Sequence, residues 1–220
     1  MKTLDTIRLR IAIGLLGFAL PWIVLAQCLI YDCVPGAHFF PNSISETYYY
    51  EPTITLFMGI LIAAGIVLMC YKGYEPIDGL INSLTGMFAL CICFFPTWGP
   101  DIDGLVGTFQ LPMAASSAIH NFSAAAFFCL LSYNCLFLFT KSSGVVTKNK
   151  RIRNVIYRVC GIGMVVSMIS IISLGSIYGG TWFIEAIALM FFGIAYLTKA
   201  DVFPFLFCDS KMEDKDTDNA

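Results

Sequence analysis

The sequence predicts an all-α polytopic membrane protein, with six transmembrane helices in one bundle and the N- and C-termini cytoplasmic. Three observations lead there: the composition, the length of the apolar runs, and the distribution of basic residues. Of the 220 residues, 58% are hydrophobic and only 13% are charged, against about 25% charged in ordinary soluble domains. Such a chain has too few polar side chains to cover a water-facing surface, so a bilayer is its natural solvent.

Six apolar runs are long enough to cross about 30 Å of hydrocarbon as helices of about 20 residues. They lie at about 11–31, 54–71, 79–96, 114–139, 155–175 and 181–199. We therefore expect one transmembrane domain over residues 1–205. A disordered, acidic cytoplasmic tail should follow at 206–220, because the chain from residue 209 onward is polar, charged and free of aromatic residues.

The first apolar run has a second interpretation. It follows a basic segment and contains Val24-Leu25-Ala26, which resembles the cleavage site of a secretory signal peptide. The apolar run continues to Ile30, however, which is long for a signal peptide. We interpret it as a transmembrane helix, with a cleaved signal peptide as the alternative.

The basic residues predict the orientation. If both termini are cytoplasmic, all 13 Lys and Arg fall on the inner side, and the outer loops 32–53, 97–113 and 176–180 contain none. This asymmetry is the positive-inside pattern of membrane proteins. The outer loops instead carry acids, which are either simply solvated or form an anionic mouth that attracts cations: Asp32, Glu46, Glu51, Asp101 and Asp103.

Two ionisable side chains lie inside apolar runs, where they are costly and are functional candidates. His120 lies about 10 Å below the outer end of the fourth span, and Glu185 about one turn below that of the sixth. The polar and aromatic stretch 40–52 precedes the second span on the same side of the membrane. We expect these parts to form an outward-facing pocket that binds its ligand through Ser43, Ser45, Glu46, Tyr49, His120, Asn121 and Glu185.

The two buried groups allow three roles. Ser116 and His120 are four residues apart and share a helix face, and an opposed Glu185 would fix the tautomer and orientation of the imidazole. The pair either pins the helices together, binds a ligand, or takes part in catalysis. The catalytic role is unknown, and its candidates are His120, Glu185, Ser45 and Glu46.

Several familiar chemistries lack their motifs. The chain has no Gly-x-Ser-x-Gly and no His-Glu-x-x-His, and His38 and His120 are too few for a three-His zinc site. We assign no metal and leave the cofactor unknown. A carboxylate-rich metal site built from Glu46, Asp101 or Asp103, His120 and Glu185 stays an alternative.

Two of the nine cysteines, Cys28 and Cys33, flank an outer loop. They could pair if that loop faces an oxidising compartment, and the sequence leaves this open.

Short motifs resemble the DRAM/Frag/Sfk group of six-span proteins. Pro41-x-Ser43-Ile44-Ser45-Glu46 is similar to the group's Pro-x-Ile-Ser-Asp signature. His120 with the following Ala124-Ala125-Ala126-Phe127-Phe128 resembles its His-x-x-Gly-Ala and aromatic in the fourth span. Glu185, with Ala200-Asp201-Val202-Phe203 after it, resembles the Glu-bearing last span.

The string 43–50, with Tyr71-Lys72-Gly73-Tyr74 and Phe94-Phe95-Pro96-Thr97, looks closer to uncharacterised bacterial six-span membrane proteins. The chain departs from the group's pattern in having Glu46 for Asp and Tyr48–Tyr50 where a Gly-containing turn is common. The resemblance implies six helices, cytoplasmic termini and a role in lipid handling, such as lipid remodelling, lipid asymmetry or membrane stress. It implies no enzymatic activity.

The leading hypothesis is an integral membrane protein whose outward-facing polar pocket binds a lipid head group or small amphiphile, in lipid handling or membrane homeostasis. The alternative is an intramembrane hydrolase or acyl transferase using His120 and Glu185, with or without a metal. A transporter, which needs a polar path through the inner half, and a structural subunit rank lower. We expect membrane lipids as partners, no nucleic acid, and location in a bacterial plasma membrane, and leave homo-oligomerisation open.

Overall fold

The computed structural model describes residues 4–71, 75–99, 104–141 and 147–203 of the chain. Asp101, Asp103 and the predicted tail at 206–220 lie outside the described residues.

Six long helices make up most of the described chain: α1 (Leu4–Tyr31), α2 (Glu51–Cys70), α3 (Pro76–Phe94), α4 (Met113–Tyr133), α5 (Lys148–Leu174) and α6 (Gly180–Lys199). A π-helical turn, η3 (Asn134–Leu138), extends α4. Each of the six is long and apolar enough to cross a membrane. The prediction of six helices long and apolar enough to span a membrane is therefore confirmed for the described residues, and these helices indicate a multi-pass membrane protein.

Local chemistry explains where the helices begin. Proline occupies the first turn of both α2 and α3, where its missing N–H leaves no hydrogen bond unmade. The side chains of Glu75 and Asp78 form a reciprocal capping box on α3. Thr147 caps α5 by accepting a hydrogen bond from the amide of Lys150. This cap explains why α5 begins at Lys148 rather than near residue 155, because helical structure extends beyond the apolar run into charged residues.

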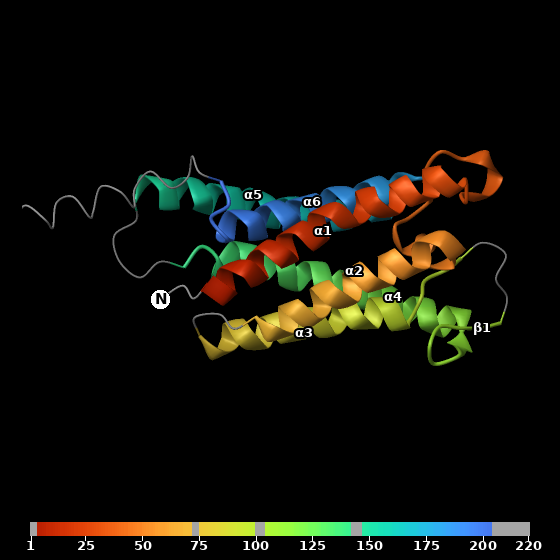
Figure 1. The fold of residues 1–220 in the computed structure, drawn as a ribbon, viewed down its shortest axis with the longest axis horizontal. Helices are drawn as coiled ribbons and strands as arrows, with labels where there is room; N and C mark the ends of the chain where they lie inside the picture. Colours follow the sequence, from red (N-terminus) through yellow and green to blue (C-terminus); the bar gives the residue numbers. More distant parts are fainter. Residues whose placement is uncertain (1–3, 72–74, 100–103, 142–146, 204–220) are drawn as a thin grey trace, which may run out of the picture.

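The helices run up and down in sequence order and close into a ring. Each helix packs against its neighbours in the sequence, and α6 packs against α1. Figure 1 shows the six helices lying alongside one another with alternating direction. By contrast, α4 and α6 have little contact. The space between α4 and α6 is therefore filled by other elements or left hollow.

Close helix contacts rest on glycine at specific crossings. A Cβ built on Gly86 of α3 would lie 2.3 Å from the carbonyl oxygen of Gly65 on α2, so only glycine allows these backbones to approach. The centre of the bundle is filled by large apolar and aromatic side chains that are almost completely buried: Phe57, Leu68, Phe127, Leu131, Met164, Trp182, Phe192 and Tyr196.

The two ends of the bundle differ. One end, here called the pocket end, carries two short 3₁₀ helices, η1 (Pro35–Ala37) and η2 (Ser45–Tyr49). It also carries a strand pair in which β1 (Leu105–Val106) lies antiparallel to β2 (Leu111–Pro112). The opposite end, here called the charged end, contains Arg10, Glu75, Lys141, Arg153 and Lys199. The start of α1 and the label of β1 lie at opposite ends in Figure 1.

Candidate functional site

The segment before α2 folds back onto the start of α6. The carbonyl of Asn42 accepts a hydrogen bond from the amide of Trp182 at 3.0 Å, and its side-chain oxygen accepts one from the amide of Gly179 at 3.2 Å. The amide of Ile44 donates to Oε2 of Glu185 at 2.7 Å. These bonds fix η2 over α6, so the polar stretch singled out in the sequence covers Glu185.

Glu185 therefore acts as an acceptor for the backbone at the beginning of η2. A carboxylate is well suited to this position, because the first amides of a helical turn have no partners within the turn. The side chain keeps partial accessibility although protein surrounds it, because it borders a cavity. Glu185 has no Lys or Arg partner among the ion pairs of the described residues.

His120 is oriented by the end of α3. Its Nδ1 lies 2.8 Å from the carbonyl oxygen of Phe95 and 3.2 Å from that of Ile92. Carbonyl oxygens only accept hydrogen bonds, so Nδ1 carries the proton and Nε2 of the neutral ring keeps its lone pair. Ser116, one turn earlier, donates to the carbonyl of Pro96 at 2.7 Å. The predicted shared face of Ser116 and His120 thus binds the carbonyl groups at the end of α3.

A cavity of about 310 Å³ lies beside these two groups. Its polar lining comes from η2 and the preceding turn, the segment after α3, and α4 and α6: Ser43, Ser45, Thr97, His120, Asn121, Thr181 and Glu185. Its apolar lining comes from α4 and α5: Ala124, Ala125, Phe128, Met168 and Ile171. The volume falls in the range of small-molecule sites, about 300–1,000 Å³.

The cavity reaches the flank of α4. Asn121 and Ala125 line it and are also exposed. Both lie well within α4, some two to three turns after its first residue, Met113. The opening is therefore at a depth where a membrane would present lipid rather than bulk water.

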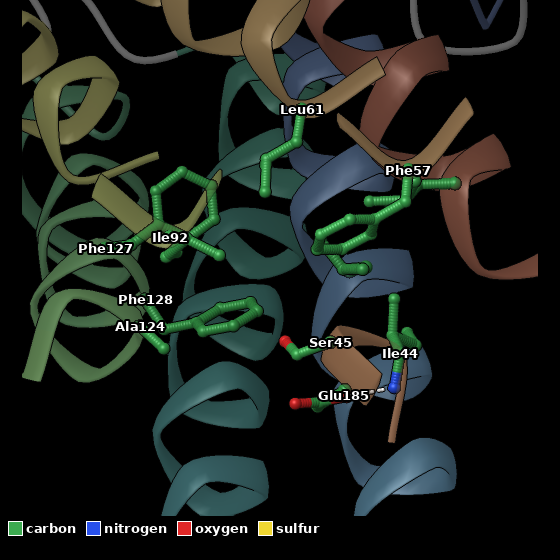
Figure 2. A pocket seen from close by; sticks show the side chains of 11 residues that line it. Ile44, Ser45, Phe57, Leu61, Ile92, Ala124, Phe127, Phe128 and Glu185 are labelled. Carbon is green, nitrogen blue, oxygen red and sulfur yellow. Dashed lines mark hydrogen bonds between the residues drawn. The ribbon is translucent and has the colours of Figure 1, made fainter. Parts of the chain in front are cut away.

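A narrower apolar pocket of about 40 Å³ adjoins the cavity, and the two share Ser45, Ala124, Phe128 and Glu185. Figure 2 shows Ser45 and Glu185 close together beside the ring of Phe128. Phe57, Leu61 and Ile92 lie toward the other end of the group. The site therefore changes from polar to apolar along its length.

The structure brings together five of the seven predicted ligand-binding residues, Ser43, Ser45, His120, Asn121 and Glu185. The other two, Glu46 and Tyr49, are not among the lining residues.

Both absent residues are engaged in holding the loop. Glu46 accepts hydrogen bonds from the Tyr50 hydroxyl at 2.8 Å and from the Asn42 amide at 3.1 Å. Tyr49 donates to the carbonyl of Thr97 at 2.6 Å. Their acceptor and donor groups therefore stabilise η2 instead of facing the cavity.

The expected direct pairing of His120 with Glu185 is also absent from the hydrogen bonds of the described residues. The imidazole is held by the carbonyls of Ile92 and Phe95 at the end of α3, and the carboxylate by the Ile44 amide at the start of η2. The tautomer of His120 is thus fixed by backbone oxygens rather than by Glu185. The two side chains remain neighbours only in the sense that both border one cavity.

The tyrosines of the pocket end are weak acids in this setting. Burial raises the pKa of Tyr49 to about 12. Burial, together with the hydrogen bond to Glu46 and its charge, also raises the pKa of Tyr50. Both hydroxyls therefore stay protonated at neutral pH and serve as hydrogen-bond donors.

Metal ligands and thiols are the other candidate reactive groups at the pocket end. Among the described residues, no three His, Cys, Asp or Glu side chains are grouped so that they could hold a metal ion. The carboxylate-rich metal site stays a hypothesis, because Asp101 and Asp103 lie outside the described chain. Cys28 and Cys33 are free thiols, and the Cys33 sulfur lies 4.0 Å from the carbonyl oxygen of Cys28.

Sequence reasoning missed a second polar region, at the charged end. Arg10, Asp78, Asn82 and Asn134 are each at most 3% exposed. The Tyr196 hydroxyl donates to Oδ1 of Asn82 at 3.1 Å. The regular spacing of Asp78 and Asn82, four residues apart on α3, was the available signal, but it does not reveal which helices face them.

Comparisons with protein-family models, curated proteins and solved structures find no match for this chain. The class that the fold and cavity define is a six-helix, multi-pass membrane protein with a polar pocket near one end. The resemblance to the DRAM/Frag/Sfk group stays a prediction.

Proposed function

We propose that this integral membrane protein binds the head group of a lipid, or a similar small amphiphile, in an outward-facing polar pocket, and serves lipid handling or membrane homeostasis. The observation that carries the proposal is the cavity of about 310 Å³, which is lined by both polar and apolar side chains. An amphiphile matches this combination, because its polar group and its hydrocarbon each meet a suitable surface.

The orientation of the pocket follows from charge. The 13 Lys and Arg lie outside the loops 32–53, 97–113 and 176–180, which favours a cytoplasmic charged end. The pocket end would then face away from the cytoplasm. The opening at Asn121 and Ala125 would give lipid of the outer leaflet lateral access to the cavity.

An intramembrane hydrolase or acyl transferase is the second candidate. One observation favours it: the cavity contains an oriented imidazole with a lone pair on Nε2, together with Ser43 and Ser45. A general base needs its nucleophile within about 3 Å. No hydrogen bond joins His120 to a serine or carboxylate oxygen among the described residues, so binding is the better-supported function.

The test is to fill the cavity without disturbing the core. Ala125→Phe places a ring at an exposed position that lines the cavity. Ala118→Phe is the matched control, because Ala118 is an exposed alanine of the same helix that does not line the cavity. Lipid retained by the purified protein is quantified by mass spectrometry.

We expect Ala125→Phe to retain at least about tenfold less lipid, a loss of about 1.4 kcal/mol in binding, while Ala118→Phe matches the wild type. Equal retention by all three proteins would contradict lipid binding in this cavity. Turnover of an ester substrate by wild type but not by His120→Gln would favour the second candidate.

A further inference from the structure

The cavity contains hydrogen-bond acceptors and no Lys or Arg side chain among its twelve lining residues. The loops at this end of the chain, residues 32–53, 97–113 and 176–180, contain no Lys or Arg either. A head group that carries only negative charge would therefore find no counter-ion in this site.

Glu185 is the principal charged group of the lining. Its Oε2 accepts a hydrogen bond from the amide of Ile44 at 2.7 Å, and the backbone of Ser45 supplies a second donor to the carboxylate. No ion pair to Glu185 is found among the described residues. A carboxylate inside a membrane-spanning bundle is costly unless a cation or several donors compensate it. The backbone supplies the amides of Ile44 and Ser45 as donors, and a cation that enters the cavity would supply the rest of the compensation.

His120 supplies a second acceptor. The residue is 3% exposed and lines the cavity. Its Nδ1 proton is directed to α3 carbonyls, so Nε2 offers a lone pair and has no hydrogen bond among the described residues. A ligand group that fits both Nε2 and Glu185 must be a donor rather than an acceptor.

A primary ammonium group satisfies these constraints. It carries a positive charge and three N–H donors with no acceptor, which suits a carboxylate, an imidazole nitrogen and one further oxygen such as that of Asn121. The ring of Phe128 also lines the cavity, and aromatic faces attract cations. A quaternary ammonium has the charge but no N–H, and a phosphate or glycerol group lacks the positive charge.

We propose that the cavity selects amphiphiles with a primary ammonium group, carried either by an aminophospholipid or by a free alkylamine. This inference rests on the proposed binding function and names its ligand class. Glu185 and Nε2 of His120 accept hydrogen bonds from the ammonium, and the apolar lining contacts the adjoining hydrocarbon.

The experiment compares lipids that share the same acyl chains. Phosphatidylethanolamine, phosphatidylcholine and phosphatidylglycerol are titrated into the purified full-length protein in detergent, and bound lipid is measured by native mass spectrometry. Glu185→Gln removes the charge but keeps an oxygen that accepts the Ile44 amide. Glu51→Gln is the matched control, because Glu51 is an exposed carboxylate at the same end that does not line the cavity.

We expect phosphatidylethanolamine to bind at least tenfold more tightly than the other two lipids. Glu185→Gln should abolish this preference, and Glu51→Gln should retain it. Equal binding of the ethanolamine and choline lipids, or an unchanged preference in Glu185→Gln, overturns the inference while lipid binding itself stands. Binding of none of the lipids overturns the proposed function.

Competition with dodecylamine and dodecanol tests whether the ammonium group alone is recognised or the whole aminophospholipid is required. The two competitors have the same chain, and only dodecylamine carries an ammonium group. If dodecylamine displaces phosphatidylethanolamine and dodecanol does not, an ammonium group on an alkyl chain is sufficient for binding. A preference for phosphatidylethanolamine that resists both competitors supports a site for the aminophospholipid. Equal displacement by dodecanol overturns the role of the charge.

Discussion

The two ends of the bundle handle charge in opposite ways. At the charged end, cations meet acceptors from other helices: Arg10 donates to the Tyr71 hydroxyl, Lys141 pairs with Glu75, and Arg153 pairs with Asp201. At the pocket end, carboxylates are held by backbone amides and a tyrosine hydroxyl, without a cation among the described residues.

This difference separates structural from ligand-accessible polar groups. The charged end encloses a void of only about 10 Å³ next to its polar side chains, about the space of one water molecule. The pocket end leaves about 310 Å³ beside His120 and Glu185. Polar residues at the charged end thus join helices, whereas those at the pocket end also present unused acceptors to a cavity.

The largest expected effect is at the charged end. Arg10→Met removes the hydrogen bond to the Tyr71 hydroxyl at 2.9 Å, the bond to the Lys199 carbonyl at 3.2 Å and the stacking on the Tyr71 ring. We expect the free energy of unfolding to fall by about 3 kcal/mol, measured by denaturation in mild detergent. Arg8→Met is the control, because Arg8 is exposed on the same helix. Equal losses in both variants would refute a structural role for this network.

A smaller loss is expected from Glu46→Gln at the pocket end. The glutamine side chain has an NH2 group in place of one carboxylate oxygen. This NH2 group cannot accept a hydrogen bond, so either the Tyr50 hydroxyl or the Asn42 amide loses its acceptor. We expect a loss of about 1–2 kcal/mol in unfolding free energy with lipid retention unchanged, because Glu46 does not line the cavity. Glu51→Gln should stay within about 0.5 kcal/mol of the wild type. Loss of lipid in Glu46→Gln at unchanged stability would show that Glu46 faces the ligand after all.

The smallest effect is expected from Tyr49→Phe, which removes the hydrogen bond to the Thr97 carbonyl and should cost about 1 kcal/mol at neutral pH. Burial raises the pKa of Tyr49 to about 12, above its value of about 10 in the unfolded chain. The unfolded state therefore loses its proton first, so this contribution is present below pH 10 and is lost as the pH rises through about 12.

To test this direction, the unfolding free energies of the wild type and Tyr49→Phe are measured from pH 9 to pH 12, with tyrosinate absorbance recorded in parallel. The wild type should lose stability more steeply than the variant. Parallel curves would mean that Tyr49 is not buried in the native state.

The six helices were predictable because the signal is local. An apolar run of about 20 residues specifies a spanning helix whatever its neighbours are. The shared face of Ser116 and His120 was likewise predictable from helical periodicity. The start of α5 at Lys148 was not, because the Thr147 cap extends the helix beyond the apolar segment.

The candidate site was predicted in part. Ser43, Ser45, His120, Asn121 and Glu185 do border one cavity, because the topology brings the loop before α2 and the first turns of α4 and α6 to one end. Whether Glu46 or Glu185 would face it could not be read from the chain. Both are acids on the same side. The orientation of the short η2 helix directs Glu46 to Asn42 and Tyr50, whereas Glu185 of α6 borders the cavity.

By itself the sequence determined the number of long apolar helices, the separation of charge along the chain, and the positions of His120 and Glu185 within their helices. These depend on composition and helical rise, which act over short stretches. Only the tertiary structure decided that carbonyls at the end of α3 hold His120, that the backbone at the start of η2 holds Glu185, and that Arg10 is buried. Such partners come from distant parts of the chain, and buried polar atoms bond with whichever donors and acceptors the packing brings within reach.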